Sequence, residues 1–143
     1  MCDYSLQSQR SRHAQADDNL VTKSIGYGVR GFAAAEDCET VVCLFPGTEI
    51  AFVEPVAYRD RNFWSFLRRG GSFLVRTRYR TAIFRQLGNR REAYERDALE
   101  FADGRIVRLT CLVAGQRAKV LQLPALARGL RTARDSRVIR TAV

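Results

Sequence analysis

The chain has 143 residues, 46% of them hydrophobic, which allows one domain with a buried core and excludes disorder throughout. No apolar run approaches the roughly 20 residues that cross a bilayer, and the polar N-terminus lacks the hydrophobic stretch of a signal peptide. We therefore expect a cytoplasmic protein, and its formal net charge of +9 indicates an anionic partner.

The sequence divides into three parts. Residues 1–19 are polar without periodicity and predict an extended N-terminal arm. Residues 20–124 alternate short β-rich runs with turn residues. They predict a mainly β domain, a small antiparallel barrel or sandwich of about seven strands with one short helix. Residues 125–143 carry an arginine at every third position from 128 to 140 and predict a basic tail, either a helix or an ordered arm.

The first half of the domain consists of short strands. Residues 20–25 (LVTKSI) and 29–34 (VRGFAA) are rich in β-formers and predict two strands. Residues 39–56 contain two β-rich runs around Pro46 and Gly47, a pair that favours a tight turn. They predict a hairpin, with Pro55 ending its second strand.

The centre of the chain predicts a helix followed by a long strand. Residues 61–71 (RNFWSFLRRGG) have Asn62 as a cap and a glycine pair as a stop. Residues 72–87 predict one strand in which Arg76, Arg78 and Arg80 share a face, because alternate side chains of a strand point the same way.

The last third predicts further strands. Residues 89–97 are ambiguous between a helix and a polar connection. Residues 98–112 predict a hairpin that turns at Asp103 and Gly104. Residues 116–124 predict a final strand that ends at Pro124.

A glycine loop at residues 26–31 (GYGVRG) matches the Gly-x-Gly-x-x-Gly pattern of dinucleotide-binding loops. That function requires a helix after the loop and then a parallel strand. Hairpins follow here, so we interpret the glycines as turn or bulge positions and expect no cofactor.

Positive charge is concentrated in the centre and the tail, with net charges of +9 over residues 55–91 and +4 over residues 128–143. Aromatic residues are interleaved with the central arginines. Arginine binds phosphates and carboxylates, and aromatic side chains stack on bases or anchor protein interfaces. We predict a non-catalytic interaction module or accessory subunit that docks on an acidic protein or a nucleic acid, and less readily on a membrane surface. The predicted contact residues are Trp64, Arg68, Arg69, Arg76, Arg78, Tyr79, Arg80, Arg128, Arg131, Arg134, Arg137 and Arg140.

The cysteines support an alternative function. Cys43 and Cys111 lie in apolar runs and are predicted to be buried free thiols, because a chain without a secretory signal seldom forms disulfides. Cys2, His13, Cys38 and Cys43 are the ligand types that zinc takes, so a thiol or metal-binding protein is the alternative. We predict no catalytic residues, since His13 is the single histidine and no nucleophile elbow or phosphate loop is present.

Several segments resemble a family of short bacterial proteins that begin Met-Cys-Asp-Tyr-Ser and carry no assigned activity. The likeness rests on MCDYSL, RGFAA, VCLFPGTE, DALEFADGRIVRL and GQRAKVLQLP and spans most of residues 1–123. In that family the segment before DALEF is often histidine-rich, whereas this chain has REAYER, which argues against a metal role there.

Overall fold

The computed structural model describes residues 10–26, 29–60, 67, 74–88 and 96–125. Within these ranges the chain forms eleven strands and one 3-10 helix. The strands are β1 (Arg10–His13), β2 (Asn19–Gly26), β3 (Val29–Ala34), β4 (Thr40–Cys43), β5 (Glu49–Phe52), β6 (Ala57–Arg59), β7 (Leu74–Arg76), β8 (Thr81–Gln86), β9 (Asp97–Glu100), β10 (Ile106–Arg108) and β11 (Arg117–Gln122), and the helix is η3 (Leu109–Cys111).

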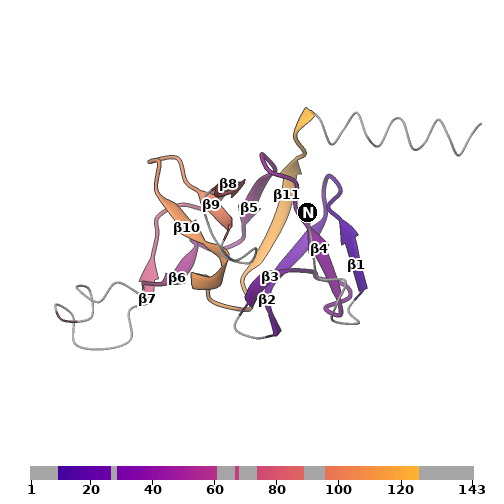
Figure 1. Ribbon diagram of the computed structural model, residues 1–143, viewed down its shortest axis with the longest axis horizontal. Helices are drawn as coiled ribbons and strands as arrows, with labels where there is room; N and C mark the ends of the chain where they lie inside the picture. The colour runs from indigo at the N-terminus through magenta and orange to yellow at the C-terminus, as the bar shows by residue number, and fades with distance from the viewer. Residues whose placement is uncertain (1–9, 27–28, 61–66, 68–73, 89–95, 126–143) are drawn as a thin grey trace, which may run out of the picture.

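Nine strands form one mixed sheet in the order β1-β4-β3-β2-β11-β5-β8-β9-β10, and β6 and β7 form a separate two-stranded sheet (Figure 1). Every neighbouring pair is antiparallel except β1 and β4, which run parallel. The predicted mainly β class is confirmed. The prediction of a small antiparallel barrel or sandwich of about seven strands is wrong, because the sheet is longer, mixed and not closed.

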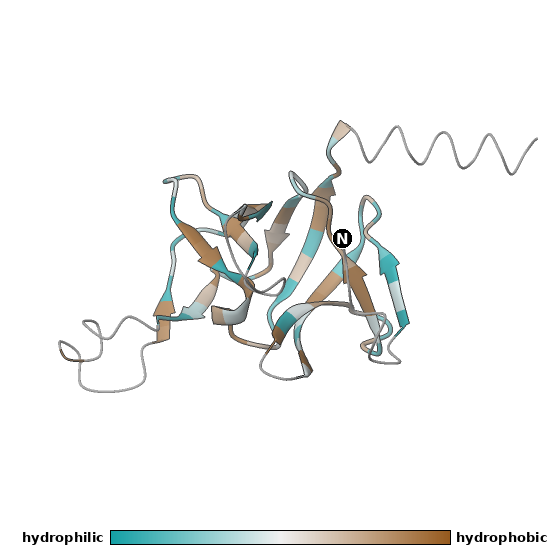
Figure 2. Ribbon diagram, viewed as in Figure 1, coloured by the Kyte–Doolittle hydropathy of each residue, from teal (hydrophilic) through white to brown (hydrophobic). Residues whose placement is uncertain are grey.

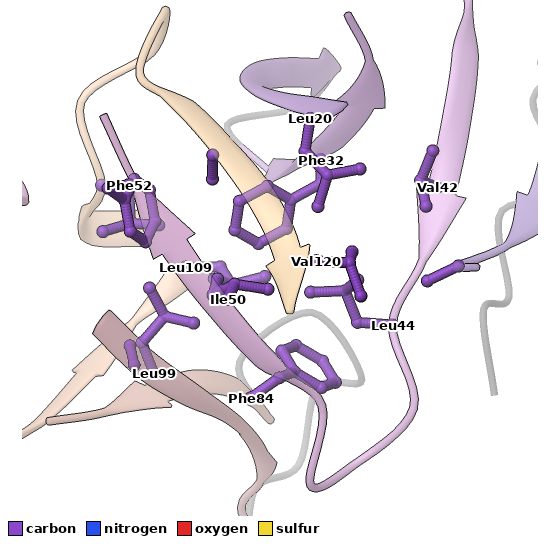
Figure 3. Close-up of a cluster of buried hydrophobic side chains, with 14 of the residues drawn as sticks. Leu20, Phe32, Val42, Leu44, Ile50, Phe52, Phe84, Leu99, Leu109 and Val120 are labelled. Carbon is purple, nitrogen blue, oxygen red and sulfur yellow. The ribbon is translucent and has the colours of Figure 1, made fainter. Parts of the chain in front are cut away.

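The large sheet curls around a single hydrophobic core (Figure 3). Phe32 of β3 and Phe52 of β5 belong to strands that are not neighbours, yet their ring centroids lie 6.3 Å apart. The helix η3 lies against β3 and β9, so it fills space between the two halves of the sheet. The largest fully buried side chains are Phe32, Leu20, Ile50, Leu99, Val56, Val120, Thr22 and Thr48.

The edge strand β1 differs in composition from the inner strands. Figure 2 shows it mostly in the hydrophilic colour, while the inner strands carry hydrophobic stretches. Arg12 pairs with Asp18 through two side-chain hydrogen bonds of 2.7 and 3.2 Å. Charged side chains on an edge strand hinder pairing with another chain. The second part of the predicted polar arm therefore forms a polar edge of the sheet.

The two strands predicted at residues 20–25 and 29–34 are confirmed as β2 and β3. They pair antiparallel, with an irregularity between Ser24 and Gly26, whose φ is +109°. A strand therefore follows the first glycine of the loop where a dinucleotide site needs a helix. Gly26 lies at the irregularity of this hairpin, as expected for a bulge glycine. Gly31 instead lies within β3 as the register partner of Lys23, and Gly28 lies outside the described residues.

The hairpin predicted over residues 39–56 is wrong in its pairing. Both strands exist, and the chain turns at Pro46 and Gly47. However, β4 pairs with β3 and β1, while β5 pairs with β11 and β8. The turn carries the chain between the two halves of the curled sheet, and the Gly47 N–H donates to the carbonyl oxygen of Phe84 at 2.7 Å.

The later hairpin and the final strand are confirmed as β9–β10 and β11. The long strand predicted over residues 72–87 is wrong, because the chain leaves the small sheet after β7 and enters the large sheet at β8. The predicted helix at residues 61–71 lies outside the described residues apart from Leu67, and the basic tail lies outside them apart from Ala125.

The β4–β5 turn gives a test of the fold. Gly47 has a φ of +94°, and a Cβ there would lie 3.3 Å from the Cβ of Pro124. We expect Gly47→Ala to lower the free energy of unfolding by about 1–2 kcal/mol, because left-handed backbone is costly for alanine. Gly88→Ala is the matched control, since its Cβ would enter open space. Urea denaturation measures both, and equal losses would contradict this view of the turn.

Candidate basic interface

The small β6–β7 sheet gathers basic side chains on one exposed face. Arg59 is paired with Leu74, and Ala57 is paired with Arg76. Directly paired residues of antiparallel strands point to the same face, and diagonal neighbours are within reach of long side chains. Arg59, Leu74 and Arg76 therefore share a face, on which Leu74 is 50% exposed.

The basic surface continues past the end of β7. Arg78 and Arg80 are exposed, Thr77 between the arginines is buried, and Tyr79 is half-buried. The predicted alternation of exposed arginines is thus present. The prediction that Arg76, Arg78 and Arg80 lie on one continuous strand is wrong, because β7 ends at Arg76 and the backbone bends at Arg78. We call Arg59, Leu74, Arg76, Arg78 and Arg80 the basic face.

The arginines of the basic face differ from many other cations in their partners. Within the described ranges, none of the four takes part in an ion pair or a side-chain hydrogen bond. Five other cations are each paired with a carboxylate, and hydrogen bonding to Asp18 raises the pKa of Arg12. Among the described residues, Arg10, Arg30, Arg108 and Arg117 also lack an ion pair, but they lie on other strands. The paired cations are Arg12, Lys23, Arg85, Arg105 and Lys119. The basic face therefore carries positive charge that no carboxylate among the described residues neutralises.

Thr77 fixes the bend between the arginines. Its N–H donates to the carbonyl oxygen of Val56 at 2.9 Å, and its hydroxyl lies 3.0 Å from the same oxygen. The hydroxyl also accepts a hydrogen bond from the N–H of Tyr79 at 3.2 Å. Because Val56 is fully buried, these bonds hold the arginine-bearing segment to the core.

Gln116 attaches the small sheet to the large one. Its Oε1 accepts from the N–H of Ala57 at 2.8 Å, and its Nε2 donates to the carbonyl oxygen of Ala57 at 2.8 Å. The same Nε2 donates to the carbonyl oxygen of Val113 at 2.9 Å, and the backbone N–H of Gln116 donates to the hydroxyl of Thr22. The side-chain amide thus pairs with β6 as a neighbouring strand would.

This amide can be tested directly. We expect Gln116→Ala to lower the free energy of unfolding by about 1–3 kcal/mol, because it leaves the N–H of Ala57 without its partner, whereas the carbonyl oxygen of Ala57 still accepts from the N–H of Val113. Hydrogen exchange of the Ala57 amide should accelerate in the same variant. Gln122→Ala is the control, since Gln122 is exposed. Unchanged exchange at Ala57 in Gln116→Ala would show that the amide does not hold the small sheet.

The aromatic residues near the basic face are partly covered. Tyr79 stacks on Phe101 with ring centroids 5.9 Å apart, and both Tyr79 and Tyr58 are half-buried. Stacking on nucleic-acid bases needs exposed ring faces. In the described part of the chain, no aromatic ring beside the basic face is fully exposed. Trp64, the other predicted aromatic contact, lies outside the described residues.

The predicted contact residues fall into those that the structure describes and those outside the described residues. Arg76, Arg78 and Arg80 belong to the basic face, and Tyr79, which is half-buried, lies between the last two in sequence. The others fall outside the described residues: Arg68, Arg69, Arg128, Arg131, Arg134, Arg137 and Arg140. Arg59, Leu74 and Gln116 were missed, because their roles depend on the β6–β7 register and on a contact across 59 residues of sequence.

The structure brings two of the predicted zinc ligands together and leaves the third apart. His13 and Cys43 are register partners on β1 and β4, and the His13 ring stacks on Phe45 at 4.9 Å. Cys38 lies in the turn before β4, where its carbonyl oxygen accepts from Lys23. In the described ranges, no group of three or more metal-binding side chains forms.

The described cysteines differ in their bonding state and burial. Cys43 is buried as expected but is disulfide-bonded, so the prediction of a free thiol is wrong for it. A disulfide sulfur is not a thiolate ligand, which removes Cys43 from a zinc site in this state. Cys38 and Cys111 are the free cysteines of the described residues, and Cys111 is half-buried rather than buried. Cys2 lies outside the described ranges.

Comparisons with protein-family models, curated proteins and solved structures found no match to this chain. Among the described residues, no helix has the length and the hydropathy needed to cross a bilayer.

Proposed function

We propose that this chain is a non-catalytic binding module that docks on an acidic protein through the basic face. The proposal is supported by the gathering of four exposed, unpaired arginines in the basic face. Arg59, Arg76 and the two arginines after it are exposed and unpaired within the described chain, whereas five other cations have a carboxylate within 4.0 Å.

An acidic protein accounts for the composition of the basic face better than a nucleic acid does. Leu74 is half-exposed between Arg59 and Arg76, and an apolar side chain surrounded by arginine is typical of protein interfaces. A single-stranded nucleic acid would need stacking platforms, but Tyr58 and Tyr79 are half-buried.

The bend at Arg78 also favours a folded protein as the partner. The arginines follow two strands and a bend instead of one straight row, so their charges are spread over a curved surface. Guanidinium groups bind carboxylates through two parallel hydrogen bonds, which suits aspartate and glutamate side chains. Exposed, unpaired arginines also attract an acidic partner before contact and so raise the rate of association.

The experiment compares two labelled probes by fluorescence anisotropy. One is an acidic peptide rich in Glu and Leu, and the other is a single-stranded DNA of the same net charge. We expect the full chain to bind the peptide more tightly and to lose about tenfold in affinity as salt rises from about 50 to about 200 mM. Tighter binding of the DNA would favour a nucleic-acid partner. Failure to bind either probe would contradict a binding module.

A further inference from the structure

The outer face of the large sheet carries a groove whose lining residues are different from those of the basic face. The groove has a volume of about 430 Å³ and runs across β11, β5, β8 and β9. It lies on the side away from the core, because its strands bury the alternate residues Ile50, Phe84, Leu99 and Val120. An outward face of an antiparallel sheet is normally polar, so apolar residues there need an explanation.

Apolar and acidic side chains alternate along this groove. Glu49 is paired with Ile83, Ile83 with Glu100, and Glu100 with Ile106 on β10. Leu121 lies in the β11 irregularity, next to Gln122, the register partner of Glu49, and it also lines the groove. Leu121 is 48% exposed and Ile106 is 49% exposed. One row across five strands therefore presents three apolar side chains separated by two carboxylates, and all of them except Ile106 line the groove.

The two carboxylates differ in their partners. Glu100 is paired with Arg85 at 2.7 Å. Glu49 is exposed and, within the described residues, has no ion pair. An occupant that suits this groove is therefore apolar and carries positive charge.

The chain itself supplies such an occupant at the rim of the groove. Pro124 lies against Gly47, two residues before Glu49, and the described chain ends one residue later at Ala125. The 18 residues that follow, 126–143, have a net charge of +4 and include Leu126 and Leu130 among their arginines. The row from β11 to β10 spans about 19 Å, and the segment would reach about 27 Å even as a helix.

We propose that the basic tail, residues 126–143, docks in cis into this groove, with Leu126 and Leu130 against Leu121 and Ile83 and an arginine beside Glu49. The docked tail covers the exposed apolar row and neutralises Glu49. The inference does not depend on the basic face, because it uses a different surface. A failure of one proposal leaves the other standing.

Limited trypsin digestion of the full chain tests the docking, since five arginines make the tail a good substrate. Cleavage after each arginine is followed by intact mass. Because cleavage tracks the population of the open form, we expect the tail to be cut about fivefold more slowly than a synthetic peptide of residues 126–143. Equal rates for the tail and the peptide would overturn the proposal.

Two variants locate the docking site. Glu49→Arg and Leu121→Ser should each bring tail cleavage toward the rate of the free peptide. Glu54→Arg is the matched control, because Glu54 is an exposed carboxylate outside the groove. It should leave the cleavage rate unchanged. Equal acceleration by Glu49→Arg and Glu54→Arg would overturn the assignment to the groove.

Concentration distinguishes docking within one chain from docking between copies. Docking in cis predicts the same cleavage rate over about a hundredfold range of protein concentration, whereas association between copies is favoured by mass action. Protection that rises with concentration would contradict the proposal and assign the groove to the tail of a second copy.

Discussion

Replacing Arg76, Arg78 and Arg80 together by alanine is expected to weaken binding of the acidic peptide about a hundredfold, at about 1 kcal/mol for each arginine. The expected loss follows from their exposure and from the lack of an ion pair within the described chain. Fluorescence anisotropy at low salt measures it, and the dependence of affinity on salt should become shallower in the variant.

The control for this triple variant removes the same net charge elsewhere. Arg85, Arg105 and Lys119 are each paired with a carboxylate, so alanine at all three positions costs little stability. We expect the control to retain affinity within about threefold, because screening weakens the effect of distant charges. If both triple variants lost affinity equally, binding would reflect net charge alone, and the basic face would have no special role.

Phe32→Ala is expected to have the largest effect on stability, lowering the free energy of unfolding by about 3–5 kcal/mol. Phe32 is 2% exposed and packs near Phe52 across the curled sheet. Such a loss is a large fraction of the roughly 5–15 kcal/mol that stabilises a typical domain.

Urea denaturation with Val53→Ala as the control measures this contribution. Val53 is 61% exposed, so its truncation should change stability by less than about 0.5 kcal/mol. A loss below about 1 kcal/mol for Phe32→Ala would contradict a core enclosed by both halves of the sheet.

The strands were predictable wherever local sequence determines them. Alternation and turn residues identified β2, β3, β11 and the β9–β10 hairpin. The pairing of β4 and β5 was not predictable, because Pro46 and Gly47 make the same turn whether the flanking strands pair or separate. β1 was missed because a short polar edge strand carries no hydrophobic period.

The break at Thr77 had no sequence signature. Threonine favours strands, so the run from residue 72 to 87 reads as continuous. Its hydroxyl instead bonds to the backbone of Val56, which lies 21 residues earlier. A tertiary contact of that range overrides a local preference.

The candidate site was predictable in part. The exposure of Arg76, Arg78 and Arg80 followed from their alternation with Thr77 and Tyr79. The contributions of Arg59 and Leu74 depend on strand register, which a single sequence does not specify. For Cys43, the apolar surroundings predicted burial correctly, but burial does not distinguish a free thiol from a disulfide.

The most direct test of the basic face is hydrogen–deuterium exchange of the full chain with and without the acidic peptide. We expect binding to slow exchange in residues 57–59 and 74–80 and to leave exchange in the large sheet unchanged. Slower exchange only in other segments, with residues 57–59 and 74–80 exchanging equally fast with and without the peptide, would contradict binding through the basic face.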